Sequence, residues 1–154
     1  ILSDFDCKSK CFQSDTNVLM SKLKGLDLVY YDPPYNQHPY GSNYHMLNTI
    51  LDYIEPLEIS KVAGIPTNWK KSLYNKQKDA LSAFSKLIKN TNSKYIMISY
   101  NNEGFISYDD MLKVCQLKGE VTVFDENYPA FRASRNLQKR KINVTEYIFL
   151  IKTY

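Results

Sequence analysis

The ten residues LDLVYYDPPY, at positions 26–35, decide how this chain folds. The first six are mostly apolar or aromatic and follow Gly25, a pattern that predicts a buried strand. Neither proline has the N–H group that a sheet ladder needs, so the strand must end at Asp32 and the chain must turn. Ligands of open α/β sheets bind at the carboxyl ends of strands, which makes this turn the first candidate for a functional site.

The chemistry of this turn suits the recognition of a flat ring that carries an amine. The Asp32 carboxylate can accept a hydrogen bond from an exocyclic amine, and the Pro33 carbonyl can accept a second one. The Tyr35 ring offers a flat face on which a base can stack. For these residues taken alone, an ordinary Pro-Pro turn after an acid is the alternative.

The rest of the chain alternates between helical and strand patterns, which predicts an α/β fold. We expect helices around residues 18–23, 42–54, 73–89 and 107–117, and further strands at residues 94–100, 120–124 and 144–151. Helices separate the first two long strands, so these should pair in parallel through a crossover. No helical pattern separates the last two strands, so they should form an antiparallel hairpin.

Caps and apolar faces refine these expectations. Ser14 or Asp15 is the expected cap of the first helix, Ser42 of the second, and residues 107–110 form a capping box. Residues 10–13 fit a brief strand. In the second helix, one face carries the apolar residues Leu47, Ile50, Leu51 and Ile54. In the third, the side chains expected to face inward are Leu73, Ala80, Leu81, Phe84, Leu87 and Ile88.

The long connection between the last two strands is basic. It carries Arg132, Arg135, Lys139, Arg140 and Lys141, with Tyr128 and Phe131 at its start. Positive charges neutralise phosphates while rings stack on bases, so the connection predicts a nucleic-acid contact. A solvated basic loop is the alternative.

Composition narrows the class of protein. With 154 residues, 44% hydrophobic and 23% charged, the chain fits one globular domain, and its net charge of +4 permits a polyanionic partner. There is no apolar run of about 18 residues and no visible signal segment, so we expect a cytoplasmic protein that does not span a membrane. Cys7, Cys11 and Cys115 lack paired CxxC spacing, and His38 and His45 are isolated, so we expect no metal site.

The Asp32–Tyr35 tetrapeptide resembles the catalytic motif of S-adenosylmethionine-dependent amino-methyltransferases that act on adenine N6. Residues 36–50, 99–104 and 132–146 extend the match, so the chain from about Phe12 onward resembles one group of bacterial site-specific DNA adenine methyltransferases. The resemblance implies a Rossmann-like fold and duplex DNA with a flipped-out adenine as the substrate. It also implies a role in a restriction-modification system of the bacterial cytoplasm.

The resemblance also implies roles for individual residues. The catalytic candidates are Asp32, Pro33, Pro34 and Tyr35; the candidates for binding S-adenosylmethionine are Phe12, Gln13, Asp15 and Asp32; and those for binding nucleic acid are Tyr35, Arg132, Arg135, Lys139 and Arg140. In the family, the turn before the catalytic strand touches the adenine of the cofactor. An ordinary turn into a helix is the alternative for Phe12, Gln13 and Asp15.

Two parts of the family's domain have no counterpart in this sequence. A glycine-rich FxGxG cofactor motif and a target-recognition region are expected upstream of the catalytic motif, but the 5 glycines here are widely spaced and the chain begins at Ile1 rather than Met. We therefore expect residues 1–154 to be a single partial domain, the C-terminal catalytic half, which is inactive without its N-terminal half or a companion subunit. The alternatives are a methyltransferase that acts on an RNA base, and a non-enzymatic remnant that binds DNA or a partner.

Overall fold

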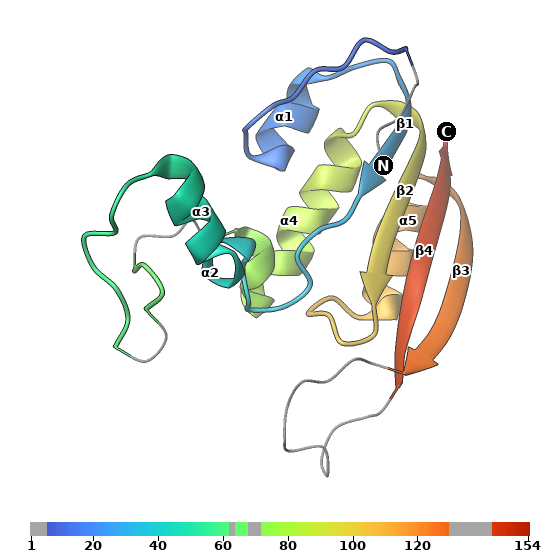
Figure 1. Cartoon of the computed structure of the whole chain (residues 1–154). Helices are drawn as coiled ribbons and strands as arrows, with labels where there is room; N and C mark the ends of the chain where they lie inside the picture. The colour runs from blue at the N-terminus through green and yellow to red at the C-terminus, as the bar shows by residue number, and fades with distance from the viewer. Residues whose placement is uncertain (1–5, 62–63, 68–71, 130–142) are drawn as a thin grey trace.

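The fold is a mixed sheet with helices on one face. Residues 6–61, 64–67, 72–129 and 143–154 are described by the structure, which is a computed structural model. Within these residues, four strands form one sheet in the order β1-β2-β4-β3: β1 is Leu26–Tyr31, β2 is Ser93–Asn101, β3 is Gly119–Pro129 and β4 is Asn143–Thr153 (Figure 1). β1 and β2 are parallel, whereas β4 is antiparallel to both β2 and β3. The predicted α/β class, parallel pair and terminal hairpin are confirmed.

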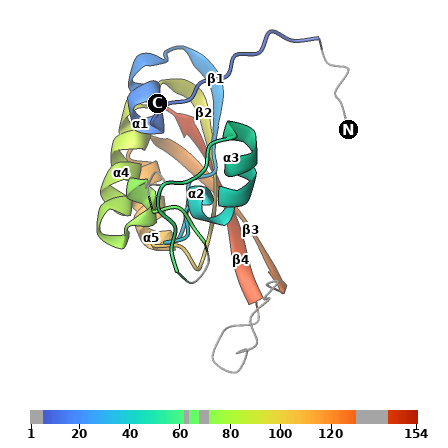
Figure 2. The ribbon, with the colours of Figure 1, turned by 60° about the vertical axis from the view of Figure 1, so that its left-hand side comes forward.

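Three helices and one 3₁₀ turn build the covered side of the molecule. They are α1 (Thr16–Lys22), the 3₁₀ turn η1 (Leu73–Asn75), α4 (Gln77–Asn90) and α5 (Tyr108–Gln116). Figure 2 shows α1, α4 and α5 together on one side of the sheet. The core lies between this helical layer and the strands: Phe84 and Leu87 of α4 join Ile96 and Ile98 of β2 in one buried cluster. Burial of this apolar cluster stabilises the fold.

The opposite face of the sheet is uncovered among the described residues. Side chains alternate between the two faces of a strand, so in β1 Val29 and Tyr31 are buried whereas Leu28 and Tyr30 are 51% and 55% exposed. Tyr95 and Phe124 extend this exposed surface across the sheet. β1 is also an edge strand in the described sheet, so one of its sides has no pairing partner there.

The predicted helix at residues 42–54 is instead two helices, α2 (Tyr40–Asn43) and α3 (His45–Asp52), separated at Tyr44. Ser42 is not the N-cap, because it lies inside α2, whose N-cap is Pro39. The Ser42 hydroxyl donates to the Pro39 carbonyl at 2.9 Å. A serine that bonds to its own turn in this way does not begin a new helix.

The apolar face predicted for this segment is present in α3 and the residues just after it, but it is exposed to solvent. Leu51 is 81% exposed, and the other members of this face are exposed as well: Leu47, Ile50 and Ile54. Among the described elements, α3 packs only against α2 (Figures 1 and 2). The spacing of apolar residues predicts a helix and its apolar face, but it does not say which element covers that face.

Two smaller predictions are also wrong. Residues 10–13 form no strand, and Leu73 and Leu81 are exposed to solvent. Leu73 lies in η1 rather than in α4, so it does not follow the helical phase of the residues after it. The other inward residues of this segment are buried as predicted: Ala80, Phe84, Leu87 and Ile88.

The predicted N-cap of α5 is confirmed, but the second hydrogen bond of the capping box comes from the Ser107 hydroxyl instead of the Ser107 backbone N–H. The Asp110 N–H donates to Ser107 Oγ at 3.2 Å, and the Ser107 hydroxyl donates to the Asp110 carboxylate at 2.7 Å. Ile106 and Met111, the hydrophobic pair that flanks the cap, are both buried.

The described residues include one buried cysteine, Cys115, and neither a cluster of metal ligands nor a helix that could span a membrane. Cys115 is buried, and burial raises the pKa of its thiol to about 12, so it is protonated and unreactive at neutral pH. In the described part of the chain, no three His, Cys, Asp or Glu side chains gather as metal ligands would. No helix in these ranges has the length and apolar character to cross a membrane.

A buried pair of hydroxyl groups ties α4 to the end of β1. The Thr91 hydroxyl donates to the Leu87 carbonyl at 2.8 Å, so the Tyr31 hydroxyl must donate to Thr91 Oγ1, at 2.6 Å. Thr91 is fully buried. Because Tyr31 directly precedes Asp32, this hydrogen bond fixes the strand at the point where the Pro-Pro turn begins.

Replacing Thr91 by valine keeps its shape but leaves the Tyr31 hydroxyl without its buried acceptor. We expect Thr91→Val to lower the free energy of unfolding by about 1–3 kcal/mol, the penalty for an unsatisfied buried polar group. Urea denaturation followed by circular dichroism measures this change. Thr122→Val, at an exposed position of β3, is the matched control. Equal losses in both variants would contradict the assigned role of Thr91.

Candidate active site

The Asp32–Tyr35 turn leaves the sheet at the carboxyl end of β1, as the sequence predicts. The ladder between β1 and β2 reaches Tyr31, and Asp32 follows it directly. Pro33 is buried, whereas Asp32 and Tyr35 are exposed. The Asp32 carboxylate has no hydrogen-bond or ion-pair partner among the described residues. The turn therefore presents a free acceptor next to an accessible aromatic ring.

The loop after β2 holds Tyr35 in place. The Phe105 N–H donates to the Tyr35 carbonyl at 2.9 Å. The edge of the Tyr100 ring meets the Tyr35 ring with centroids 6.4 Å apart and an interplanar angle of 85°. Tyr100 is itself fixed, because its hydroxyl accepts the Ile106 N–H at 3.2 Å. The loop after β2 therefore lies beside the turn, as expected for two parallel strands that end at the same edge of the sheet.

The surroundings of Tyr35 are acidic. Partial burial, followed by the charges of Glu146, Asp32 and Glu103 and the neighbouring Tyr40, raises the pKa of its hydroxyl above the ordinary value. The ring is therefore neutral at physiological pH and keeps its hydroxyl proton. A neutral ring beside carboxylates suits an uncharged base that donates hydrogen bonds better than it suits a phosphate.

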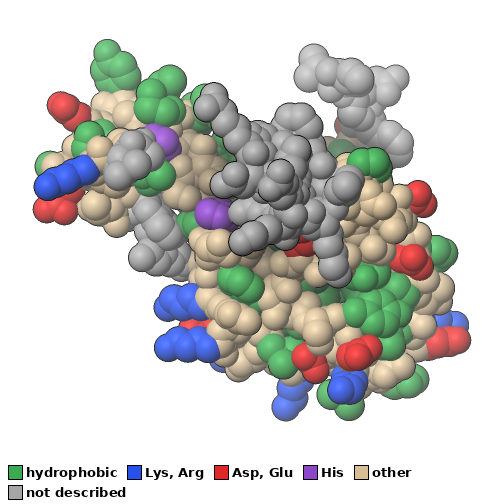
Figure 3. Space-filling model, turned by 90° about the horizontal axis from the view of Figure 1, so that it is seen from below, with side chains coloured by type: hydrophobic (Ala, Val, Ile, Leu, Met, Phe, Trp, Pro, Cys, Tyr) green, Lys and Arg blue, Asp and Glu red, His purple; other side chains and the backbone are tan. Residues whose placement is uncertain are grey.

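Figure 3 looks onto the end of the sheet where the turn lies. On this face, the described lysine and arginine side chains lie at the margins, and acidic side chains are interspersed with apolar ones. The predicted nucleic-acid contacts Arg132, Arg135, Lys139 and Arg140 lie outside the described residues, as do Phe131 and Lys141.

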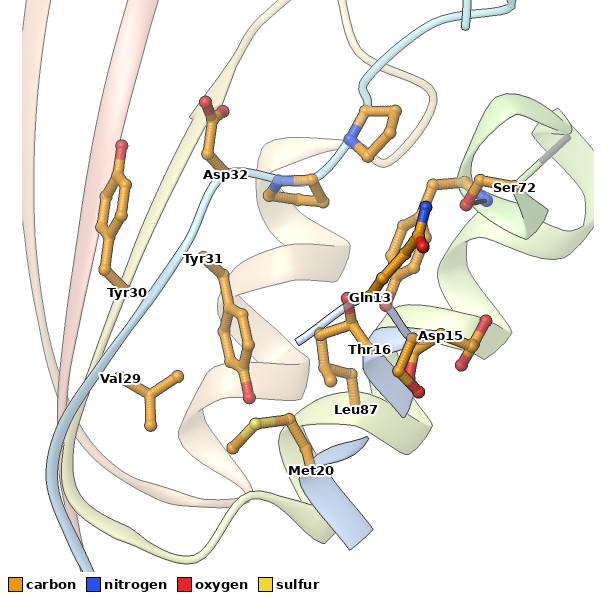
Figure 4. Close-up of a pocket in the computed structure, with 14 residues that line it drawn as sticks. Gln13, Asp15, Thr16, Met20, Val29, Tyr30, Tyr31, Asp32, Ser72 and Leu87 are labelled. Carbon is orange, nitrogen blue, oxygen red and sulfur yellow. Dashed lines mark hydrogen bonds between the residues drawn. The ribbon is translucent and has the colours of Figure 1, made fainter. Parts of the chain in front are cut away.

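A cavity of about 740 Å³ opens beside the turn, between β1, α1 and η1 (Figure 4). Gln13, Asp15 and Asp32 line it, which brings together three of the four predicted cofactor-binding residues. Phe12 does not line the cavity and is 55% exposed. The sequence did not point to the other lining side chains, among them Thr16, Met20, Tyr30, Ser72 and Tyr74. Ser72 and Tyr74 lie far along the chain from Gln13, and no local pattern connects them.

Asp15 has the structural role that the sequence offered as an alternative, and His45 makes a structural hydrogen bond as well. The Val18 N–H donates to Asp15 Oδ1 at 3.1 Å, so Asp15 caps α1 while it lines the cavity. His45 Nδ1 lies 2.9 Å from the Ser42 carbonyl, an acceptor, so this nitrogen carries the proton and the ring is held at the start of α3. His45 is therefore a capping residue.

Comparison with known proteins identifies the family. The model of the D12 class N6 adenine-specific DNA methyltransferases matches residues 2–114, most of the chain. This chain belongs to that family. Its residues 32–35 are the tetrapeptide whose resemblance to adenine-N6 methyltransferases we noted above, and the structure places them at a strand end beside a cavity.

Curated relatives agree with the family model. The chain is 33% identical to the type II methyltransferase M.NlaIII of Neisseria lactamica, over 92% of this chain and 42% of that protein. It is 38% identical to the modification methylase StsI of Streptococcus sanguinis, over 94% of this chain and 22% of the relative. The corresponding values for M.CviAII of Paramecium bursaria Chlorella virus 1 are 37%, 81% and 37%. The chain thus spans from about a fifth to about two fifths of the length of its curated relatives. No solved structure matches it significantly.

Gly104 allows the Tyr100 ring to lie against the loop after β2, because a Cβ at this position would overlap that ring. We expect Gly104→Ala to displace Tyr100 and to lower the free energy of unfolding by about 1–3 kcal/mol, as overpacking does. Chemical denaturation measures the loss. In a Tyr100→Ala background the same substitution should cost much less, because the overlapping ring is absent. Equal costs in both backgrounds would contradict this account of the loop.

Proposed function

We propose that this chain is the catalytic part of an S-adenosylmethionine-dependent methyltransferase that methylates adenine N6 in duplex DNA. The observation that carries the proposal is the Asp32 carboxylate, which has no partner among the described residues. It lies beside the Tyr35 ring, at a strand end next to a cavity, in a member of this family. The relatives named as type II and modification methylases support a role in a restriction-modification system. A DNA substrate would place the protein in the bacterial cytoplasm.

The proposed chemistry depends on how the turn holds the amine. N6 of adenine is a poor nucleophile because its lone pair is delocalised into the ring. Hydrogen bonds from N6–H to Asp32 and to the Pro33 carbonyl would draw the nitrogen toward tetrahedral geometry and free that lone pair. N6 could then accept the methyl group as its bond to the sulfonium sulfur breaks, and the proton that N6 loses would pass to solvent. Positioning and electrostatic stabilisation supply most of the rate gain, rather than a strong base. The rigid Pro33-Pro34 backbone keeps the Asp32 carboxylate and the Pro33 carbonyl in a fixed position relative to each other.

Tyr35 holds the target base in this proposal. Adenine must leave the duplex to reach Asp32, and the loss of its stacking partners costs a few kcal/mol. A stack on the accessible Tyr35 ring offsets about 1–3 kcal/mol of this cost. The edge contact with Tyr100 keeps the ring in a fixed orientation.

The cavity beside β1 suits the cofactor in size and chemistry. Its volume of about 740 Å³ is in the range of small-molecule sites. Gln13 lines it from the segment before α1, and Asp32 lies at its margin, at the end of β1 (Figure 4). S-adenosylmethionine supplies an electrophilic methyl group on a sulfonium sulfur. Gln13, Asp15 and Asp32 are the residues that we propose to hold it, whereas the exposure of Phe12 does not support a role for that ring.

We further propose that residues 1–154 form a single partial domain whose cofactor-binding half, with an FxGxG motif, packs against it in the same protein or in a companion subunit. Three surfaces that the described residues leave exposed support this: the edge of β1, one face of the sheet and the apolar face of α3. Edges and apolar faces of this extent favour capture by a partner. The greater length of the relatives supports the same view.

Removing the Asp32 carboxylate tests the catalytic proposal. In a complete methyltransferase that contains this chain, Asp32→Ala should lower the rate of methyl transfer to adenine by a factor of about 100 or more, because a preorganised partner of N6 is lost. Mass spectrometry of digested DNA measures N6-methyladenine. Asp27→Ala is the matched control, because Asp27 lies on the same strand and makes only an exposed ion pair with Lys94. Near-normal turnover of Asp32→Ala would contradict the proposed mechanism. Methylation of RNA instead of DNA would favour the alternative in which the acceptor is an RNA base.

The basic connection at residues 130–142 is the proposed contact to the DNA backbone. Replacing Arg135 and Arg140 by alanine should weaken binding to all duplexes alike. It should also flatten the dependence of log affinity on log salt by up to about 0.9 per lost phosphate contact. Fluorescence anisotropy with labelled duplex DNA at several salt concentrations measures both effects. An unchanged salt slope would assign these residues to solvent or to a protein partner.

A further inference from the structure

Glu146 lies on β4, close to the candidate site, and joins the two neighbouring strands. Its Oε1 accepts a hydrogen bond from the Asn101 side-chain amide at 3.2 Å and another from the Tyr128 hydroxyl at 2.9 Å. Asn101 ends β2 and pairs with Glu146 in the ladder, whereas Tyr128 lies near the end of β3. One carboxylate oxygen thus links the ends of β2 and β3 across β4.

The hydrogen bonds continue from Asn101 to the catalytic turn. Asn101 is only 6% exposed, and its side-chain oxygen accepts the Glu103 N–H at 3.1 Å while its backbone carbonyl accepts the Gly104 N–H at 3.3 Å. These bonds shape the loop whose Phe105 N–H holds the Tyr35 carbonyl. The Glu146 carboxylate therefore stands at one end of a chain of contacts that ends at Tyr35.

The Glu146 carboxylate lies between two hydrogen-bond donors from different strands. Glu146 is half-buried, and within the described ranges no lysine or arginine forms an ion pair with it. Glu146 raises the pKa values of two nearby tyrosines. Its hydrogen bond with Tyr128 is the largest cause of the raised pKa of Tyr128. For Tyr35, the negative charge of Glu146 raises the pKa as the second cause after burial.

We propose that Glu146 is a positioning residue of the active site, which locks the loop after β2 to the β3–β4 hairpin and so fixes Tyr35 against the target base. The proposal rests on the proposed function, because it takes Tyr35 as the platform for adenine. Small displacements of a group that orients the reacting atoms have large effects on the rate. Because Tyr128 is near the end of β3 and Glu146 near the start of β4, the same carboxylate couples the hairpin to the catalytic turn.

Hydrogen exchange on the 154-residue chain tests the structural half of this proposal. In Glu146→Ala, exchange in peptides that cover residues 102–106 should speed up by about tenfold or more, because the bond that fixes Asn101 is lost. Glu126→Ala is the matched control, since Glu126 faces Glu146 in the ladder and is exposed. Exchange at residues 148–152 should stay slow in both variants, which reports an intact hairpin. Unchanged exchange at residues 102–106 in Glu146→Ala would overturn the link.

Kinetics of the complete methyltransferase test the functional half. Glu146→Ala should lower kcat for adenine methylation about tenfold or more, with the KM for S-adenosylmethionine unchanged. Glu146→Gln should restore most of kcat, because its amide oxygen can accept both hydrogen bonds. A wild-type kcat in Glu146→Ala, or no rescue by glutamine, would overturn the positioning role. If the wild-type enzyme itself fails to methylate adenine, the proposed function fails, and the exchange experiment still decides whether Glu146 holds the loop.

Discussion

Pro33 and Pro34 impose the constraint on which the rest of this structure depends, because neither can donate a hydrogen bond to a neighbouring strand. The ladder of β1 therefore stops after Tyr31, while β2 continues to Asn101. The turn that results leaves Asp32 at the sheet edge, where no described residue binds its carboxylate. The chain beyond the turn is then caught again, where the Phe105 N–H binds the Tyr35 carbonyl. The end of the β1 ladder thus makes the Asp32 carboxylate accessible, and the hydrogen bond from the loop after β2 holds the turn at Tyr35.

The site draws on segments that are distant in the sequence. The turn into α1 and the η1 turn form the wall of the cavity, β1 supplies the Asp32 turn, and the loop after β2 supports Tyr35. β4 contributes Glu146 from the far end of the chain. Most of the elements that surround the cavity, α1, η1 and α4, lie on the face of the sheet that the helices cover. The other face and the edge of β1 are exposed in the described residues, which is why we infer that a second body completes the cofactor site.

The sequence predicts those features of the fold that depend on residues only a few positions apart. The end of β1, the Asp15 and Ser107 caps and the buried face of α4 are of this kind, and the structure confirms them. The convergence of the loop after β2 with the Asp32 turn was also predictable, because parallel strands end at the same sheet edge. The exposure of Leu51 and Phe12, and the link from Glu146 to Asn101, were not, because they depend on which distant element lies nearby. Apolar spacing identifies the apolar face of α3, but it cannot tell a core face from an interface.

The central claim is that this chain carries the catalytic turn and only part of the cofactor site. Calorimetric titration of the purified 154-residue chain with S-adenosylmethionine tests it most directly, alongside methyl transfer to adenine-containing duplex DNA. The account predicts no saturable binding in the micromolar range and no turnover by the chain alone, with both appearing when the cofactor-binding half is supplied. Stoichiometric micromolar binding with turnover by the isolated chain would contradict it.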